Sequence, residues 1–197
     1  MTTTLSAATG VEHLFSEAHT AYNFAETPVT DEQLRTIYET VKWAPTAMNS
    51  QPLRIAFARS AGARLDLQRH VAPGNVPKVR SAPVTAILAY DADWHENLPA
   101  LMPFATDPHL AWQDPARREP MAKMNATLQA GYFILGVRAH GLAAGPMGGF
   151  DREGVDRAFF PDGRWRSLLL VNIGHPGDEA FRPRMPRLSF DQAAVLV

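Results

Sequence analysis

The chain has 197 residues and a mass of 21.7 kDa, which fits a single domain over residues 1–197. Its 19 basic and 20 acidic residues leave a net charge of −1, so we expect no nucleic-acid partner and no attachment to an anionic membrane. The lack of cysteine excludes disulfides, thiolate metal sites and a thiol nucleophile.

The N-terminal segment contains no lysine or arginine before Arg35, whereas a secretory signal or transit peptide needs a positive region. No apolar run approaches the roughly 20 residues that cross a bilayer, and the best candidate, residues 167–173, has only the length of a strand. We therefore predict a cytoplasmic protein.

The first half of the chain begins with a helix signal. Thr30-Asp31-Glu32-Gln33 has the form of a capping box, and apolar residues then follow at helical spacing until Pro45. Farther along, alternation and composition predict a strand over 54–59, a short helix over 62–70 and a buried strand over 82–90. Residues 94–120 are rich in proline, aspartate and aromatics without a regular period, and we interpret them as an irregular excursion that could act as a lid.

A long helix is predicted from Arg118 to His140, with Gly141 ending it. It has two apolar faces, one formed by Met121, Met124, Leu128, Tyr132, Leu135 and Ala139, the other by Phe133, Ile134 and Val137. A helix that is apolar on two faces is buried on two sides, and the second neighbour could be another subunit.

The last third contains the glycine motif Gly145-Pro146-Met147-Gly148-Gly149-Phe150, then a short helix from Asp151, a strand over 167–173 and a tail rich in proline and arginine. Glycines permit backbone conformations closed to other residues and let a flat ligand approach the peptide N–H groups, but the same motif also fits a plain turn. The irregular order of helices and strands predicts an α+β fold with a central mixed or antiparallel sheet flanked by helices.

Several catalytic signatures are absent from the sequence. It has no G-x-G-x-x-G after a strand, no P-loop, no H-E-x-x-H and no G-x-S-x-G, so we predict neither a tightly held dinucleotide nor a serine hydrolase. No two histidines lie three to five residues apart, and we predict no metal site.

Four separated segments fit flavin mononucleotide (FMN) when they are taken together. The loop Pro45 to Pro52 offers a hydroxyl and carboxamides for the ring edge and ribityl chain, although it could be a plain polar loop. Asn75 and Lys78 add a carboxamide and a cation, and Lys78 alone would be read as a solvated surface lysine. Guanidinium groups suit a terminal phosphate, and the tail supplies three that could equally be solvated: Arg182, Arg184 and Arg187.

These segments resemble the nitroreductase family of FMN-dependent oxidoreductases from about Phe24 to the C-terminus. The likeness is greatest to the malonic semialdehyde reductase (3-hydroxypropionate dehydrogenase) subgroup of the pyrimidine-utilisation pathway. It rests on Glu26-Thr27-Pro28-Val29, Lys42-Trp43, Pro45-Thr46 through Asn49, Gly74-Asn75, Ala82 to Ile87, Gly145-Pro146-Met147 with Gly149-Phe150-Asp151, and Pro186 to Phe190.

The resemblance implies a nitroreductase-like fold that forms a homodimer with FMN at the interface, and it implies a role for each matched segment. Pro45, Thr46, Ala47, Asn49 and Gln51 would reach the flavin from the partner subunit, while Asn75 and Lys78 would address its pyrimidine edge. Pro146, Met147, Gly148 and Gly149 would lie along the ring, and Arg182 and Arg184 would hold the phosphate.

The chain departs from the family pattern near its N-terminus. Members commonly carry an arginine-rich segment there that grips the phosphate, whereas this chain has Ala18 to Phe24, in which His19 and Thr20 can still donate hydrogen bonds. We therefore expect the phosphate to depend more on the C-terminal arginines.

The implied reaction is a ping-pong hydride transfer in which NADPH or NADH reduces the flavin at N5 and a small-molecule acceptor reoxidises it. No catalytic side chain is assigned firmly, and Lys78 is the candidate for stabilising negative charge on the reduced ring. For malonic semialdehyde, Arg54 could pair with the substrate carboxylate, and Phe104 and Trp112 could cover the ring. The alternatives are a broad-specificity nitro, quinone or enal reductase and a non-catalytic flavin-binding protein.

Overall fold

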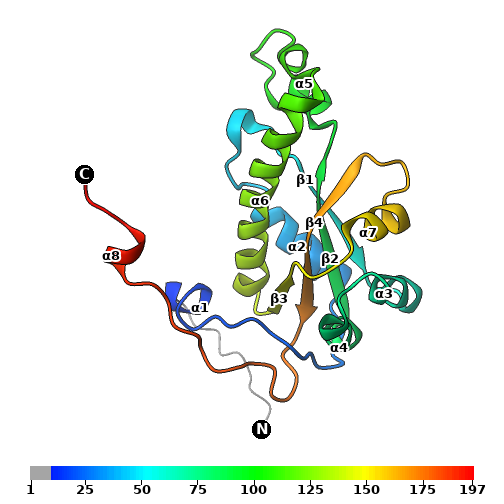
Figure 1. Ribbon diagram of the computed structural model, residues 1–197, viewed down its shortest axis with the longest axis vertical. Coiled ribbons are helices and arrows are strands. Elements are labelled where there is room, and N and C mark those ends of the chain that lie inside the picture. The colour runs from blue at the N-terminus through cyan, green and yellow to red at the C-terminus, as the bar shows by residue number, and fades with distance from the viewer. Residues whose placement is uncertain (1–9) are drawn as a thin grey trace.

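The computed structural model describes residues 10–197, which form an antiparallel four-stranded sheet with helices on both faces (Figure 1). The strands β1 (Leu53–Ala58), β2 (Val84–Asp91), β3 (Ala143–Met147) and β4 (Trp165–Gly174) follow the order β1-β2-β4-β3. Val84 on β2 lies opposite Ile173 on β4, with a bulge between Leu88 and Ala89. The predicted α+β class is confirmed, and the sheet is wholly antiparallel.

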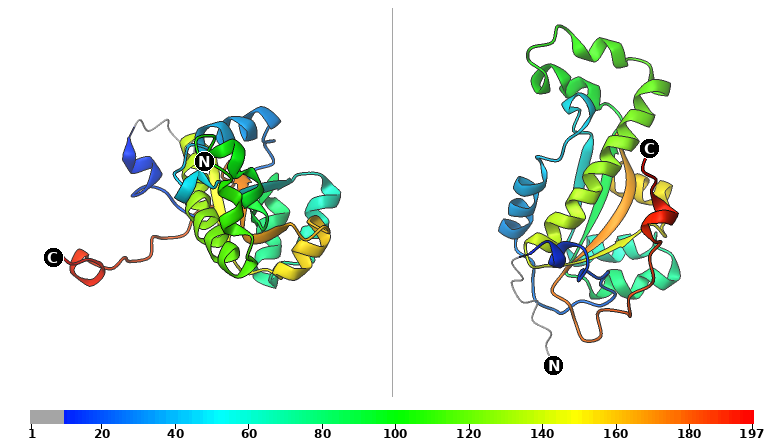
Figure 2. Two further views of the ribbon diagram at one scale, coloured as in Figure 1. Left: turned by 90° about the horizontal axis from the view of Figure 1, so that it is seen from above. Right: turned by 90° about the vertical axis from the view of Figure 1, so that its left-hand side faces the viewer.

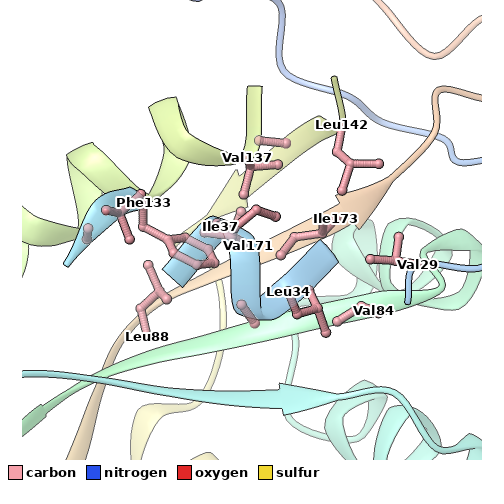
Figure 3. Packing of buried hydrophobic residues seen from close by; sticks show 14 residues of the cluster. Val29, Leu34, Ile37, Val84, Leu88, Phe133, Val137, Leu142, Val171 and Ile173 are labelled. Atoms are coloured by element: carbon pink, nitrogen blue, oxygen red, sulfur yellow. The ribbon is translucent and has the colours of Figure 1, made fainter. Parts of the chain in front are cut away.

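Alternate residues of the central strands face two separate cores, as the period of two along a strand requires. On one face, Val84, Ala86 and Leu88 pack with α2 (Asp31–Val41) and α6 (Pro115–Ala139). Figure 3 shows Val84 and Leu88 in this core. Gly136 of α6 lets α2 approach closely, because a Cβ there would lie 2.1 Å from the Val41 side chain. On the other face, Ile87 and Ala89 pack with α3 (Ala61–Gln68), α4 (Val76–Ser81) and α7 (Arg152–Phe159).

The predicted helices are present with adjusted ends. Thr30 caps α2 through a complete capping box with Gln33, as the sequence predicts. The long helix α6 begins at Pro115 rather than Arg118, because Asp114 accepts a hydrogen bond from the Ala116 N–H and proline is tolerated in the first turn. Among residues 10–197, no helix is both long and apolar enough to cross a membrane.

The excursion over residues 94–120 is more ordered than its sequence suggests. It contains short helices at η3 (Trp94–Asn97), α5 (Leu98–Leu101) and η4 (Pro108–Trp112), and Trp94 and Leu98 are fully buried with Ala122 and Ala126 of α6. The segment stands at one end of α6 (Figure 1).

The glycine motif was predicted as a turn, but its first half is the edge strand β3. Gly145 pairs with Asn172 of β4, and a Cβ at Gly145 would lie 2.7 Å from the carbonyl oxygen of Ala21. The sequence hid this strand because glycine and proline are rare in strand interiors and proline is tolerated only at an edge.

Both ends of the described chain lie outside the sheet. The segment that carries α1 (Val11–Leu14) and the tail after β4 run alongside each other, and Tyr22 N–H donates to the Ala180 carbonyl. The tail then extends away from the body, through the short helix α8 (Phe190–Ala193), as the left view of Figure 2 shows.

Candidate functional site

Two cations lie over the ring of Tyr22. Lys78 Nζ is 4.6 Å from the ring centroid and the Arg182 guanidinium carbon is 4.4 Å from it. Lys78 Nζ also donates to Asn75 Oδ1 over 2.9 Å, and Asn75 Nδ2 donates to the Gly149 carbonyl over 3.0 Å. The structure therefore brings together three of the predicted segments: Asn75 with Lys78, the glycine turn, and the C-terminal arginines.

This group of cations has no negative partner among residues 10–197. Neither Lys78 nor Arg182 forms an ion pair with an aspartate or glutamate there. Burial, followed by the charge of Arg182, lowers the pKa of Lys78. Two neighbouring cations without a carboxylate make a local positive field that favours an anion or developing negative charge.

The turn after β3 is open where the sequence predicts contact with a flat ligand. A Cβ at Gly148 would meet nothing within 4 Å, whereas one at Gly149 would lie 3.0 Å from Asn75 Nδ2. Neither glycine adopts a left-handed φ, so the expectation of an unusual backbone conformation is wrong. The turn instead uses glycine for its lack of a side chain. Pro146 lies in β3, and the Met147 side chain is buried in the core, so Met147 could meet a ligand there only through its backbone.

The loop from Pro45 to Gln51 is strained and strongly held. Met48, Asn49 and Gln51 have φ values of 58°, 49° and 42°, in the left-handed region that non-glycine residues rarely occupy. Gln51 N–H donates to Thr46 Oγ1 over 3.1 Å, and Gln51 Nε2 donates to Asn49 Oδ1 over 2.8 Å. These bonds fix the polar side chains in one arrangement.

Two buried side chains of α6, neither among the predicted site residues, hold this loop and the start of β1. Asn125 Oδ1 accepts from the Ala47 N–H over 2.7 Å, and Gln129 Oε1 accepts from the Leu53 N–H over 3.0 Å. Both residues are nearly inaccessible to solvent. A buried amide inside an otherwise apolar helix face is the signal that could have found them, because it requires a hydrogen-bond partner.

Among residues 10–197, the Pro45–Gln51 loop and the C-terminal arginines line two different hollows. The loop lines a hollow with Lys42, Trp43 and Ala44. The arginines line another, of about 840 Å³, together with residues of the N-terminal segment.

We call this second hollow the arginine cavity; four arginines line it, together with His19, Thr20 and Tyr22: Arg138, Arg182, Arg184 and Arg187. Arg184 Nη2 donates to the Ala18 carbonyl over 3.0 Å, which ties the tail to the N-terminal segment. His19 and Phe181 have ring centroids 5.7 Å apart. Arg138, from the last turn of α6, was not among the predicted site residues.

Arg54, the residue predicted to bind a substrate carboxylate, already has a carboxylate partner. Arg54 donates to Asp91 Oδ2 over 2.7 Å, and Arg164 Nε donates to Asp91 Oδ1 over 2.9 Å. Asp91 is only 1% exposed, and Arg164 also pairs with Glu96 at 3.0 Å, so two arginines and two carboxylates form a neutralised group that we call the Asp91 cluster. A substrate carboxylate would have to compete with Asp91 for Arg54.

The two aromatic residues of the excursion also differ from each other. Trp112 packs on Trp94 with ring centroids 5.2 Å apart, so its ring belongs to the local core. Phe104 is 84% exposed, so among residues 10–197 its ring packs against no core and could contact a ligand only at the surface. The described part of the chain gathers no group of three or more His, Asp or Glu residues suited to a metal ion.

Comparison with known proteins identifies the class to which this fold and site belong. The family model described as "Nitroreductase family" matches residues 16–175, and the chain belongs to that family. The predicted nitroreductase-like fold is thereby confirmed.

Among curated relatives, a protein of Streptomyces griseus is 52% identical over 185 residues, which cover 93% of this chain and 94% of the relative. One of Streptomyces coelicolor is 50% identical over 181 residues, covering 91% and 90%. Both carry the name "Putative NADH dehydrogenase/NAD(P)H nitroreductase".

Solved structures share the fold at low sequence identity. The FMN complex of a "putative nitroreductase" from Exiguobacterium sibiricum superposes with a TM-score of 0.85 at 20% identity, covering 96% of this chain and 98% of the other. A structure titled as an NAD(P)H:FMN oxidoreductase of Staphylococcus epidermidis, also qualified as putative in its title, gives 0.85 at 19% identity over the whole of both chains.

Proposed function

We propose that this protein is an FMN-dependent NAD(P)H oxidoreductase. The observation that carries the proposal is the group of Asn75, Lys78 and Arg182 beside the open Gly148–Gly149 turn, in a chain of the nitroreductase family. FMN presents a flat ring and a phosphate, which this group can meet with a glycine surface and unpaired cations. The names and titles of the relatives, which mention NAD(P)H and FMN, support the same cofactor pair.

When bound, FMN supplies a carrier that takes hydride from NAD(P)H and gives it to an acceptor. The chain's own residues would position the flavin and stabilise the negative charge that develops on its ring. Lys78 donates to Asn75, which in turn donates to the Gly149 carbonyl, so the ammonium group is held in place near the glycine turn and would stabilise negative charge that develops on a bound ring. Gly148 leaves room for a planar group where any side chain would intrude.

The homodimer remains a prediction, which three surfaces support. On α6, Met124, Leu128 and Tyr132, which belong to the first of the two predicted apolar faces, are 62%, 47% and 41% exposed. The tail, which extends away from the body (Figure 1), contains exposed apolar residues. The polar loop Pro45–Gln51 lines one hollow and the C-terminal arginines line another. A second copy covering α6 could bring that loop to the arginine cavity.

Light scattering after gel filtration tests the dimer. We expect wild type to run as a dimer, and Leu128→Glu to run as a monomer without flavin. Leu65→Glu is the matched control, because Leu65 is 57% exposed on α3, and it should leave the dimer intact. A monomeric wild type would contradict this prediction.

Two acceptor classes remain under this cofactor assignment. The finer prediction is malonic semialdehyde, reduced to 3-hydroxypropionate, as the sequence likeness implies. The contact of Arg54 with buried Asp91 favours the alternative, a reductase of uncharged quinones, nitroaromatics or enals, because the proposed anchor for a substrate carboxylate already has a partner. Steady-state kcat/KM values across these acceptors, with NADH and NADPH, separate the two classes.

The visible spectrum of purified protein tests the cofactor assignment itself. We expect flavin absorbance near a 1:1 ratio to chain, and bleaching by NADPH or NADH without oxygen. Colour that neither nicotinamide bleaches would support a non-catalytic flavin-binding protein instead. The cytoplasmic location stays a prediction from sequence.

A further inference from the structure

Arg138 occupies the last turn of α6 and lines the arginine cavity. One nitrogen, Nη1, donates to the Leu14 carbonyl over 3.2 Å. The Nε atom is buried and has no hydrogen-bond partner among residues 10–197. An unpaired buried donor is costly, and in native proteins it commonly marks a missing ligand or water.

The charges around Arg138 make this cost larger. None of the residues that line the arginine cavity is an aspartate or glutamate, and in the described part of the chain none of its four arginines forms an ion pair. Burial and the nearby charge of Arg184 lower the pKa of Arg138. Four guanidinium groups in one hollow repel one another unless an anion lies among them.

We propose that Arg138 binds the terminal phosphate of the flavin together with Arg184, so that α6 supplies the cation that the segment Ala18–Asn23 lacks. This inference rests on the proposed flavin function. A phosphate monoester carries up to two negative charges and several acceptor oxygens, and the planar guanidinium matches that geometry. The same chemistry occurs in the 2′-phosphate of NADPH, so the test must separate the two sources.

A purely structural role is the alternative for Arg138. Its Nη1 contact to Leu14 and its carbonyl contact to His13 Nε2, at 3.0 Å, both attach α1 to α6. Loss of that attachment would disturb any flavin, with or without a phosphate. Riboflavin has the same ring and ribityl chain as FMN but no phosphate, and it therefore distinguishes the two roles.

The experiment titrates flavin-free full-length protein with FMN and with riboflavin, following flavin fluorescence. We expect Arg138→Gln to weaken FMN binding by about 10- to 100-fold while riboflavin binding stays within about twofold. Arg138→Lys, which keeps the charge but not the fork, should lie between. Arg157→Gln is the matched control, because Arg157 also ends a helix but is exposed and faces Glu153; it should change neither affinity.

Each other outcome overturns the inference. Equal loss of both flavins would assign Arg138 a structural role, and unchanged binding of both would remove it from the site. Unchanged FMN affinity with a KM raised for NADPH but not for NADH would assign the arginine to the 2′-phosphate of NADPH. If wild type bound neither flavin, the proposed function would fail as well, and that result differs from every variant effect. Thermal unfolding of each flavin-free variant checks that it folds.

Discussion

The Asp91 cluster and the arginine cavity both gather arginines, but they balance charge in opposite ways. In the cluster, Arg54 and Arg164 share one carboxylate that is almost fully buried, at distances of 2.7 and 2.9 Å. In the cavity, Arg138 and its neighbours have no carboxylate among the described residues. A cation group that is neutralised from within holds the fold together, whereas one left uncompensated is suited to a ligand. The two regions should therefore respond differently to substitution.

The largest effect is expected at the Asp91 cluster. Asp91→Ala leaves the partly buried Arg54 without its carboxylate partner and Arg164 with only the exposed Glu96, and we expect a loss of about 3 kcal/mol in the free energy of unfolding. Urea denaturation measures it. Asp66→Ala, which removes an exposed pair with Arg69, should cost less than about 0.5 kcal/mol. Equal losses in the two variants would contradict a structural role for the Asp91 cluster.

The reverse pattern is expected for the arginine cavity. Arg184→Ala should reduce FMN affinity by about 10- to 100-fold, because a charge-assisted contact to phosphate is lost. Stability of the flavin-free protein should change little, since loss of the exposed hydrogen bond to the Ala18 carbonyl is offset by relief of the repulsion with Arg138. Flavin content after purification and urea denaturation provide the two measurements. Unchanged flavin content would exclude Arg184 from the site, and a large loss of stability would erase the contrast with Asp91.

Gly149→Val sharpens the comparison at the edge of the cavity. A Cβ at this position would lie 3.0 Å from Asn75 Nδ2, so the branched side chain should displace Asn75 and with it the partner of Lys78. We expect about a tenfold loss of both FMN and riboflavin affinity, because the ring rather than the phosphate is affected. Gly62→Val, on α3 with open space around it, is the control for the β-branched side chain. Normal binding of both flavins would indicate a plain turn.

The smallest effect is a pH dependence beside the Asp91 cluster. Burial, followed by the charge of Arg118, lowers the pKa of His95 below its ordinary 6.5. Below pH 6.5 the unfolded chain takes up this proton more readily, so the contribution of His95 to stability falls as pH drops toward its lowered value. His95→Gln should give a shallower decline of stability between pH 7 and 5 than wild type. Identical slopes would show that His95 does not contribute.

Local signals in the sequence predicted much of the fold. The capping box at Thr30 and the apolar spacing after it define α2, and β-branched composition predicts β2. Strand β3 was missed because its Gly145-Pro146 pair is atypical of strands and is tolerated only by its edge position. The conformational preferences of its own residues cannot reveal β3, because its pairing with β4 supplies the contacts that stabilise it.

Site residues were predicted where the type of side chain suggests a ligand. They were missed where the role depends on the place of the residue in the fold. Asn75, Lys78 and Arg182 have side chains that suggest a polar ligand, and the fold brings them together. Asn125 and Arg138 act from the long helix, on segments that are distant in sequence, and only the packing of α6 shows where they point. Arg54 shows the converse, because the sequence suggests a free cation and the fold pairs it with Asp91.

The uneven placement of arginines has a practical consequence for purification. The chain as a whole is nearly neutral, with an isoelectric point of about 6.7, so a single bound phosphate monoester of about two negative charges changes a large part of its net charge. Empty and loaded molecules should separate on an anion-exchange column near neutral pH, the loaded form eluting later. The ratio of the two peaks would then report occupancy directly, in a crude preparation and without any assay of turnover.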